Sequence, residues 1–154
     1  MEFFWNRKTG KIYILEVNTR VAQHHSELFL KVDGVSNHQV PVDLALGRVP
    51  VLPDRKGAFR VAAACFYREF QDARVDRVPD LEEVARIEKQ IPGTIIQIDV
   101  KPDIMLSELP EQDSYSYICA LIYLGAADQK TLLKNYRKCL NALNFKMTPV
   151  SDSS

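Results

Sequence analysis

The stretch Glu16-Val17-Asn18-Thr19-Arg20 follows an apolar run and carries a carboxylate, a carboxamide and a guanidinium at alternate positions. In an extended segment, alternate residues lie on the same face of the chain. Glu16, Asn18 and Arg20 are therefore predicted to face the same small volume. The first two offer oxygen ligands for a hard cation such as Mg²⁺, and the arginine offers a fork of donors for phosphate or carboxylate. The alternative interpretation is an exposed strand end without any site.

Two β-prone runs before this stretch favour a site over an exposed strand end. Residues 2–5 and residues 11–16 are rich in aromatic and β-branched side chains, and the hydrophilic turn between them ends in Gly10. The pattern predicts a β-hairpin that brings Glu2 of the first strand beside Glu16 of the second. Two carboxylates and one amide oxygen would then converge, which suits a site that links Mg²⁺ to nucleotide phosphates.

These residues resemble the signature of the ATP-grasp ligases, and within that superfamily the biotin-carboxylase-like branch. The family pattern is a glutamate on one strand, a hairpin, and then Glu-x-Asn-x-Arg at the end of the next strand, and these places are filled here by Glu2, Glu16, Asn18 and Arg20. The resemblance implies that Glu2, Glu16 and Asn18 hold Mg²⁺ or Mn²⁺. It also implies that Glu16 and Arg20 bind ATP and that Arg20 is catalytic, close to a carboxylate that ATP activates as an acyl phosphate for attack by an amine or related nucleophile.

The residues after Arg20 depart from the biotin carboxylase pattern. Those enzymes continue with a Gln-Val-Glu-His series that binds bicarbonate and supplies a base, whereas this chain has Val21-Ala22-Gln23-His24-His25. The departure counts against bicarbonate as the substrate and affects the ATP and metal chemistry less. We predict that His24 takes the base position as a catalytic residue, because a histidine side chain can accept and release a proton near neutral pH. The alternative is a solvated histidine at the start of a helix.

Parts of an ATP-grasp enzyme are not recognisable in the sequence. The family has a first domain, a Gly-rich lid over the phosphates and phosphate-holding lysines before the strand that carries Glu2, and the sequence contains no Gly-rich phosphate loop. We therefore expect the chain to be the carboxy-terminal part of such a ligase, inactive alone, with the missing amino-terminal half supplied in cis or in trans. The alternative is a non-catalytic remnant that acts as a binding or assembly module and can form a homodimer.

Composition is that of an ordinary globular protein and excludes several classes of function. The 154 residues suffice for a hydrophobic core, and 20 basic residues balance 20 acidic ones, so there is no basic field for nucleic acid or an anionic membrane. No apolar run approaches the ~20 residues that a bilayer span needs. Three separated cysteines are predicted to be buried free thiols of a cytoplasmic protein: Cys65, Cys119 and Cys139.

The chain is predicted to divide into three parts. Turn-forming residues cluster around residues 49–57, where the sequence pattern changes. The parts follow in chain order: residues 1–48 for the carboxy-terminal half of an ATP-grasp domain with the metal and phosphate site, residues 49–147 for a biotin-carboxylase-C-like sheet-and-helix subdomain, and residues 148–154 for a disordered tail.

The predicted fold class is α+β, with an antiparallel hairpin and sheet covered by helices. Asp80 and Glu83 are predicted to form a capping box at a helix start. A strand resembling residues 58–70 carries an active-site arginine in biotin carboxylases, and Phe66 near that place again counts against bicarbonate. Helices are predicted at residues 24–32, 36–46, 81–91 and 128–143, and strands at residues 58–70 (or a helix there), 94–100, 104–106 and 113–125.

Overall fold

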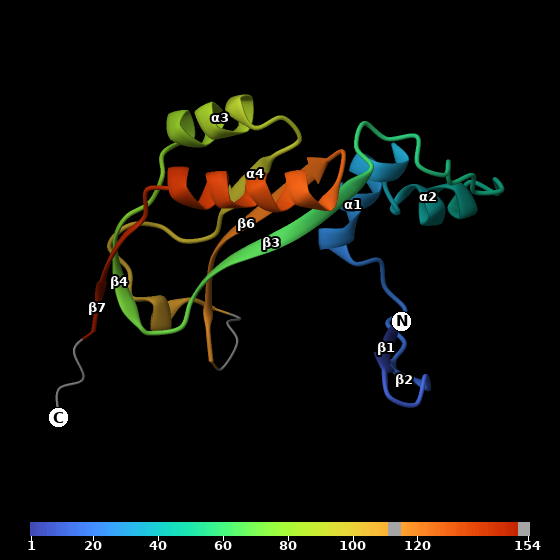
Figure 1. Cartoon of the computed structure of the whole chain (residues 1–154), viewed down its shortest axis with the longest axis horizontal. Coiled ribbons are helices and arrows are strands. Elements are labelled where there is room, and N and C mark those ends of the chain that lie inside the picture. Colours follow the sequence, from blue (N-terminus) through green and yellow to red (C-terminus); the bar gives the residue numbers. More distant parts are fainter. Residues whose placement is uncertain (111–114, 151–154) are drawn as a thin grey trace.

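The computed structural model describes residues 1–110 and 115–150 of the chain, and these form an α+β fold with antiparallel sheets (Figure 1). Within that part of the chain, no helix is long and apolar enough to cross a membrane. The elements in chain order are β1 (Glu2–Trp5), β2 (Ile12–Glu16), α1 (Gln23–Asp33), α2 (Gln39–Ala45), β3 (Val61–Glu69), β4 (Ala73–Arg77), α3 (Leu81–Gln90), β5 (Ile95–Ile98), the 3₁₀ turn η1 (Leu106–Glu108), β6 (Tyr117–Ala126), α4 (Gln129–Ala142) and β7 (Lys146–Pro149).

The central sheet has the strand order β3-β6-β5, and both strand pairs are antiparallel. On one face α4 contributes Leu132 and Cys139 to a cluster with Ile122 of β6, and Cys65 of β3 packs against the same cluster. Phe66, the next residue of β3, points to the other face, because successive side chains of a strand alternate. There it meets α1, which contacts both β3 and β6. The sheet is therefore covered by helices on both faces.

A second, smaller sheet pairs β4 with β7, and neither strand is predicted from the sequence. Its core is formed with η1 and the end of β6, where Val75, Leu106 and Cys119 are fully buried. The prediction of a disordered tail at residues 148–154 is wrong for Thr148 and Pro149, because both residues belong to β7 and pair with β4. Residues 151–154 lie outside the described residues.

Two further predictions along the chain are corrected. Residues 104–106 do not continue the sheet of β5: Leu106 begins η1, and Met105 instead bridges Arg74 of β4. The strand predicted at residues 113–125 begins at Tyr117, and the predicted residues 113 and 114 lie outside the described part. The remaining predicted helices and strands are present with shifted ends.

The capping box is confirmed, and the prediction of buried free cysteines is confirmed for two of the three. The Asp80 carboxylate accepts from the Glu83 backbone N–H at 2.8 Å, and the Glu83 carboxylate accepts from the Asp80 N–H at 3.0 Å. All three cysteines are free; Cys119 and Cys139 are buried and Cys65 is half-buried.

Helix α1 is fixed to the central sheet by a loop that follows α2. The Phe59 N–H donates to the Lys31 carbonyl at 3.0 Å, and the Gly57 N–H donates to the Val32 carbonyl at 2.8 Å. Only glycine fits at position 57, because a Cβ there would overlap the Lys31 carbonyl. The Phe59 ring in turn lies against Gly125 of β6, so the end of α1 has a defined place on the sheet.

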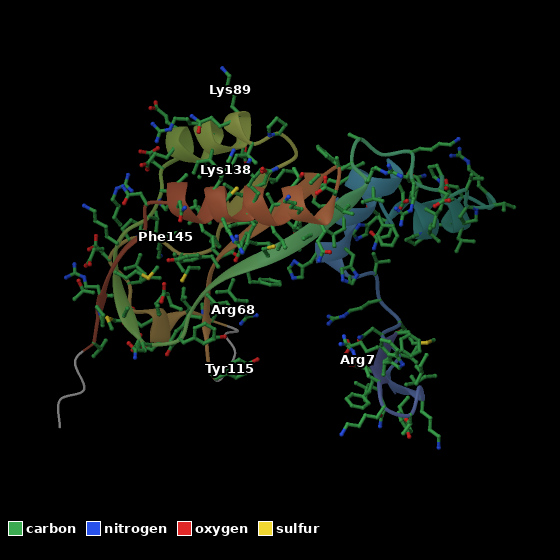
Figure 2. The ribbon with its side chains drawn as sticks, viewed as in Figure 1. Arg7, Arg68, Lys89, Tyr115, Lys138 and Phe145 are labelled. Carbon is green, nitrogen blue, oxygen red and sulfur yellow. The ribbon has the colours of Figure 1, made fainter. Side chains whose placement is uncertain are left out.

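The β1–β2 hairpin stands apart from the body of the molecule and is joined to α1 by residues 17–22 (Figure 1). Its side chains spread into solvent, and Arg7 at the turn holds its guanidinium carbon 5.6 Å from the Trp5 ring (Figure 2). The pairing register assigns apolar residues to both faces of the hairpin. At least 50% of each of these side chains is exposed: Phe3, Phe4, Trp5, Ile12, Tyr13 and Ile14.

Candidate functional site

Glu2 lies opposite Glu16 because the hairpin contains a β-bulge. The pairing is regular up to Phe3 and Ile14, and the register then shifts by one residue, so that Leu15 is the extra residue of β2. Without the bulge Glu2 would face Leu15. Residues directly opposite each other in an antiparallel pair have their side chains on the same face, so the bulge places Glu2 and Glu16 on one face of the hairpin.

Asn18 completes this group from the segment after β2. Its Nδ2 donates a hydrogen bond to Glu2 Oε1 at 3.2 Å. The amide oxygen of Asn18 and the second oxygen of Glu2 take no part in that bond and can accept another partner. All three side chains, those of Glu2, Glu16 and Asn18, are exposed, so they are open to a ligand from solvent.

An open cavity of about 700 Å³ extends from this group toward α1. Of the five predicted site residues, four line the cavity: Glu2, Asn18, Arg20 and His24. Glu16 is not among the described residues that line it. The cavity also includes two residues that the sequence does not single out for a role, His25 and Asn37. Its lining is Met1, Glu2, Asn18, Arg20, Val21, Ala22, His24, His25 and Asn37.

His24 is held against the central sheet. Its ring meets the Phe66 ring edge to face, with the centroids 5.6 Å apart and the planes at 84°. The guanidinium of Arg68 also lies on the Phe66 ring, 5.2 Å from its centroid. The same guanidinium donates a hydrogen bond to Ser116 Oγ at 2.7 Å. His24 therefore lines the cavity, and the contact with Phe66 of β3 helps to fix the position of its ring. The catalytic role of His24 stays a prediction.

A polar cluster between α1 and α2 is missed from the sequence. Ser26 Oγ donates to Asn37 Oδ1 at 2.9 Å and lies 2.8 Å from His38 Nδ1. The predicted helix from residue 36 begins only at Gln39, because Ser36 Oγ accepts from the His38 N–H and closes a turn before the helix. Because the helix starts late, Asn37 lies in a loop at the cavity wall. The Ser-Asn-His series at residues 36–38 is typical of turns, and it is the sequence signal that could have indicated this loop.

The donor set fits a magnesium ion shared with a phosphate ligand. Within residues 1–110 and 115–150, no group of three or more His, Cys, Asp or Glu side chains could hold a metal. The hairpin offers two carboxylates and one amide oxygen, all hard donors. Mg²⁺ is commonly held by one or two carboxylates together with substrate phosphates rather than by a complete protein cage. The residues present therefore suit such an ion, and their role as ligands stays a prediction.

The fold is similar to that of a biotin carboxylase domain. One matching solved structure is the biotin carboxylase domain of the 2-oxoglutarate carboxylase from Hydrogenobacter thermophilus, a dimer in complex with MgADP, ADP and bicarbonate. The two chains are 16% identical with a TM-score of 0.62, and the match covers 95% of this chain and 31% of that one. No family model matches the sequence, and no curated protein matches it.

This likeness is one of fold, and the antiparallel sheets with helices agree with the predicted α+β class. The chain spans about a third of the length of the similar domain.

Proposed function

We propose that the chain is the carboxy-terminal part of an ATP-grasp ligase that uses Mg-ATP to activate a carboxylate as an acyl phosphate. The observation that supports the proposal is the pairing of Glu2 with Glu16 at a bulged strand end, with Asn18 bonded to Glu2 beside a cavity that Arg20 and His24 also line. The similar biotin carboxylase domain was solved with MgADP, which supports a nucleotide and a magnesium ion as ligands.

In this proposal the hairpin carboxylates and Asn18 hold Mg²⁺ or Mn²⁺. When bound, the ion neutralises phosphate charge and orients the nucleotide. Arg20 supplies a planar fork of N–H donors for the phosphate and carboxylate oxygens, and with Glu16 it binds the nucleotide. These residues hold the reactants and stabilise negative charge where the phosphoryl group is transferred.

The reaction then has two balanced steps. A carboxylate oxygen of the substrate bonds to the γ-phosphorus of ATP and ADP leaves, which gives the acyl phosphate. The nucleophile next attacks the carbonyl carbon, and inorganic phosphate leaves with the electron pair of the broken C–O bond. An amine must lose a proton in the second step, and His24 on the cavity wall is the side chain that accepts it.

The exposed hairpin supports the proposal that the site needs a partner. A two-stranded hairpin is marginally stable alone, and this one exposes apolar side chains on both faces. We propose that the missing amino-terminal half of the ATP-grasp domain, in cis or in trans, covers it. Residues 1–48 would then complete that domain and residues 49–147 the subdomain behind it, in a cytoplasmic enzyme.

The same exposed surface favours a second candidate function. A non-catalytic remnant would keep the apolar hairpin as a binding or assembly module, for example in a homodimer, and the similar domain was solved as a dimer. Metal binding separates the two candidates, because an assembly module has no need of the Glu2, Glu16 and Asn18 group.

Isothermal titration of the full chain with MgADP tests the ligand assignment. We expect weak binding by the native chain and a loss of roughly tenfold or more in affinity for Glu16→Gln and Asn18→Ala, since each removes one oxygen ligand or its charge. Glu82→Gln and Asn141→Ala make the same chemical changes at exposed sites on other helices and should bind as the native chain does. Equal heats for the native chain and all four variants would remove the metal assignment. Rapid ATP hydrolysis by the pure chain would contradict the proposal that the chain is inactive alone.

A further inference from the structure

The polar cluster between α1 and α2 presents one amide to the cavity in a fixed orientation. Asn37 is half-buried at the cavity wall, and its Oδ1 is the acceptor for Ser26 Oγ at 2.9 Å. Ser36 Oγ lies 3.5 Å from the same oxygen. A carboxamide oxygen accepts two hydrogen bonds, so the oxygen of Asn37 is saturated by these two hydroxyl groups. Its NH₂ end is left to bond a molecule in the cavity.

The position of a proton on His38 follows from this arrangement. Ser26 has a single hydroxyl proton, and it is given to Asn37 Oδ1, which can only accept. His38 Nδ1 lies 2.8 Å from the same hydroxyl oxygen. We assign His38 the tautomer with hydrogen on Nδ1, because the Ser26 proton is given to Asn37 and the Ser26 oxygen is then the acceptor; Ser36 Oγ lies 3.4 Å from the same nitrogen. The series His38, Ser26, Asn37 is thus a directional chain of hydrogen bonds that ends in the two donors of the amide.

The lining of the cavity offers both acceptors and donors. Glu2 and the Asn18 amide oxygen lie at its hairpin end, where a cation would bind. A second set of lining groups includes the Arg20 guanidinium, the histidines of α1 and the Asn37 amide. An anionic, planar group with two acceptor oxygens matches this second set, because guanidinium and amide N–H groups both bond carboxylate oxygens in the plane of the group.

We propose that Asn37 is a specificity-determining residue of this cavity: its Nδ2 binds a carboxylate oxygen of the substrate, with Ser26 and His38 as positioning residues. The identity of the anion as the substrate carboxylate rests on the proposed function. The binding contact itself rests only on the cavity and the hydrogen-bond chain. A neutral amide in this place selects a carboxylate without adding a charge next to Arg20.

Proton–nitrogen NMR of the full ¹⁵N-labelled chain tests the contact with sodium acetate as the probe. The side-chain NH₂ signals of Asn37 are assigned by their loss in Asn37→Asp, and acetate is added against sodium chloride at equal ionic strength, without metal or nucleotide. We expect these signals to shift with acetate and saturate, whereas those of the exposed Asn141 stay in place. Asn37→Asp should weaken acetate binding roughly tenfold or more, because a donor is lost and a like charge is added.

Two further variants separate the contact from a structural role. Ser26→Ala removes the hydroxyl that orients the amide and should weaken acetate binding several-fold although Ser26 does not touch the ligand, while Asn141→Asp should bind as the native chain does. The backbone spectrum of each variant reports whether it is folded. Unmoved Asn37 signals, native acetate affinity in a folded Asn37→Asp, or a His38 ring with hydrogen on Nε2 alone would each overturn the inference.

The outcome is independent of the metal assignment. If acetate acts on Asn37 as expected but MgADP gives equal heats in Glu16→Gln and the native chain, the carboxylate contact stands and the proposed ATP-grasp site fails. If MgADP binding depends on Glu16 and acetate leaves Asn37 unchanged, the reverse holds.

Discussion

Tyr67 on β3 has an environment that resists ionisation. Its ring stacks on Phe145 with the centroids 4.9 Å apart and the planes at 8°, and its hydroxyl donates to Glu69 Oε1 at 3.1 Å. Figure 2 shows Phe145 between the end of α4 and the β4–β7 sheet. Burial, together with the charge of Glu69 and this hydrogen bond, raises the pKa of Tyr67 to about 12 from the ordinary value of 10.0.

A phenol with a raised pKa stabilises the folded state in its protonated form. That contribution is complete below pH 10, and it is lost between pH 10 and about 12, where the unfolded chain ionises first. We expect the native chain to lose stability to urea more steeply than Tyr67→Phe over this range. The phenylalanine variant should also lack one tyrosine that ionises late in an alkaline absorbance titration. Tyr115→Phe, at an exposed position, is the control and should keep the native pH dependence.

Sequence patterns predict the pairing of Glu2 with Glu16 but not the backbone irregularity that produces it. The predicted hairpin places Glu2 opposite Glu16, whereas the bulge at Leu15 has no signal in an apolar run. Asn37 escapes prediction for a related reason: its place at the cavity depends on contacts with Ser26, which lies 11 residues earlier on another element.

At the scale of elements, the capping box of α3 offers a measurable contribution. Asp80 holds the first turn through the Glu83 N–H, and the Glu83 carboxylate also pairs with Arg77 of β4. Asp80→Ala should reduce the free energy of unfolding by about 1 kcal/mol, as is usual for the loss of such a cap. Urea denaturation followed by circular dichroism measures the change.

Asp54→Ala is the matched control for this substitution. Asp54 is an exposed aspartate of the loop before β3, and its replacement should stay within about 0.5 kcal/mol of the native stability. An equal effect of the two substitutions would show that the cap of α3 contributes nothing specific.

The elements that sequence patterns predict are those with local signals. Helix α3 has its cap, and β3, β5 and β6 have long β-branched or apolar runs. Strands β4 and β7 carry charged residues and a proline, and they are stabilised by pairing with each other although they lie far apart in the chain, as in the pair Ala73 and Pro149. Such pairing is fixed by tertiary packing and leaves little trace in either segment alone.

At the scale of the whole molecule, Trp5 reports on the hairpin, because it is the single tryptophan of the sequence. It is 58% exposed. We expect acrylamide to quench its fluorescence in the folded chain nearly as well as in urea, and amide hydrogens of β1 and β2 to exchange faster than those of β6. If Trp5 became less accessible to acrylamide as the protein concentration rises, this would instead indicate that two copies of the chain associate through their hairpins.

Sequence patterns do not predict where the hairpin lies relative to the rest of the molecule. Periodicity indicates that β1 and β2 pair with each other, and it does so correctly. Both faces of the hairpin are apolar, however, and the described residues provide nothing to bury them.

The two walls of the cavity are anchored differently. Helix α1 is hydrogen-bonded at Lys31 and Val32 to the loop before β3, whereas Glu2 belongs to a hairpin that is joined to α1 by the short segment that carries Asn18. A partner that clamps the hairpin would therefore adjust the gap between the two sides of the cavity. In the proposed enzyme, turnover would then rise and fall with the binding of that partner, so that docking itself would act as the on-switch.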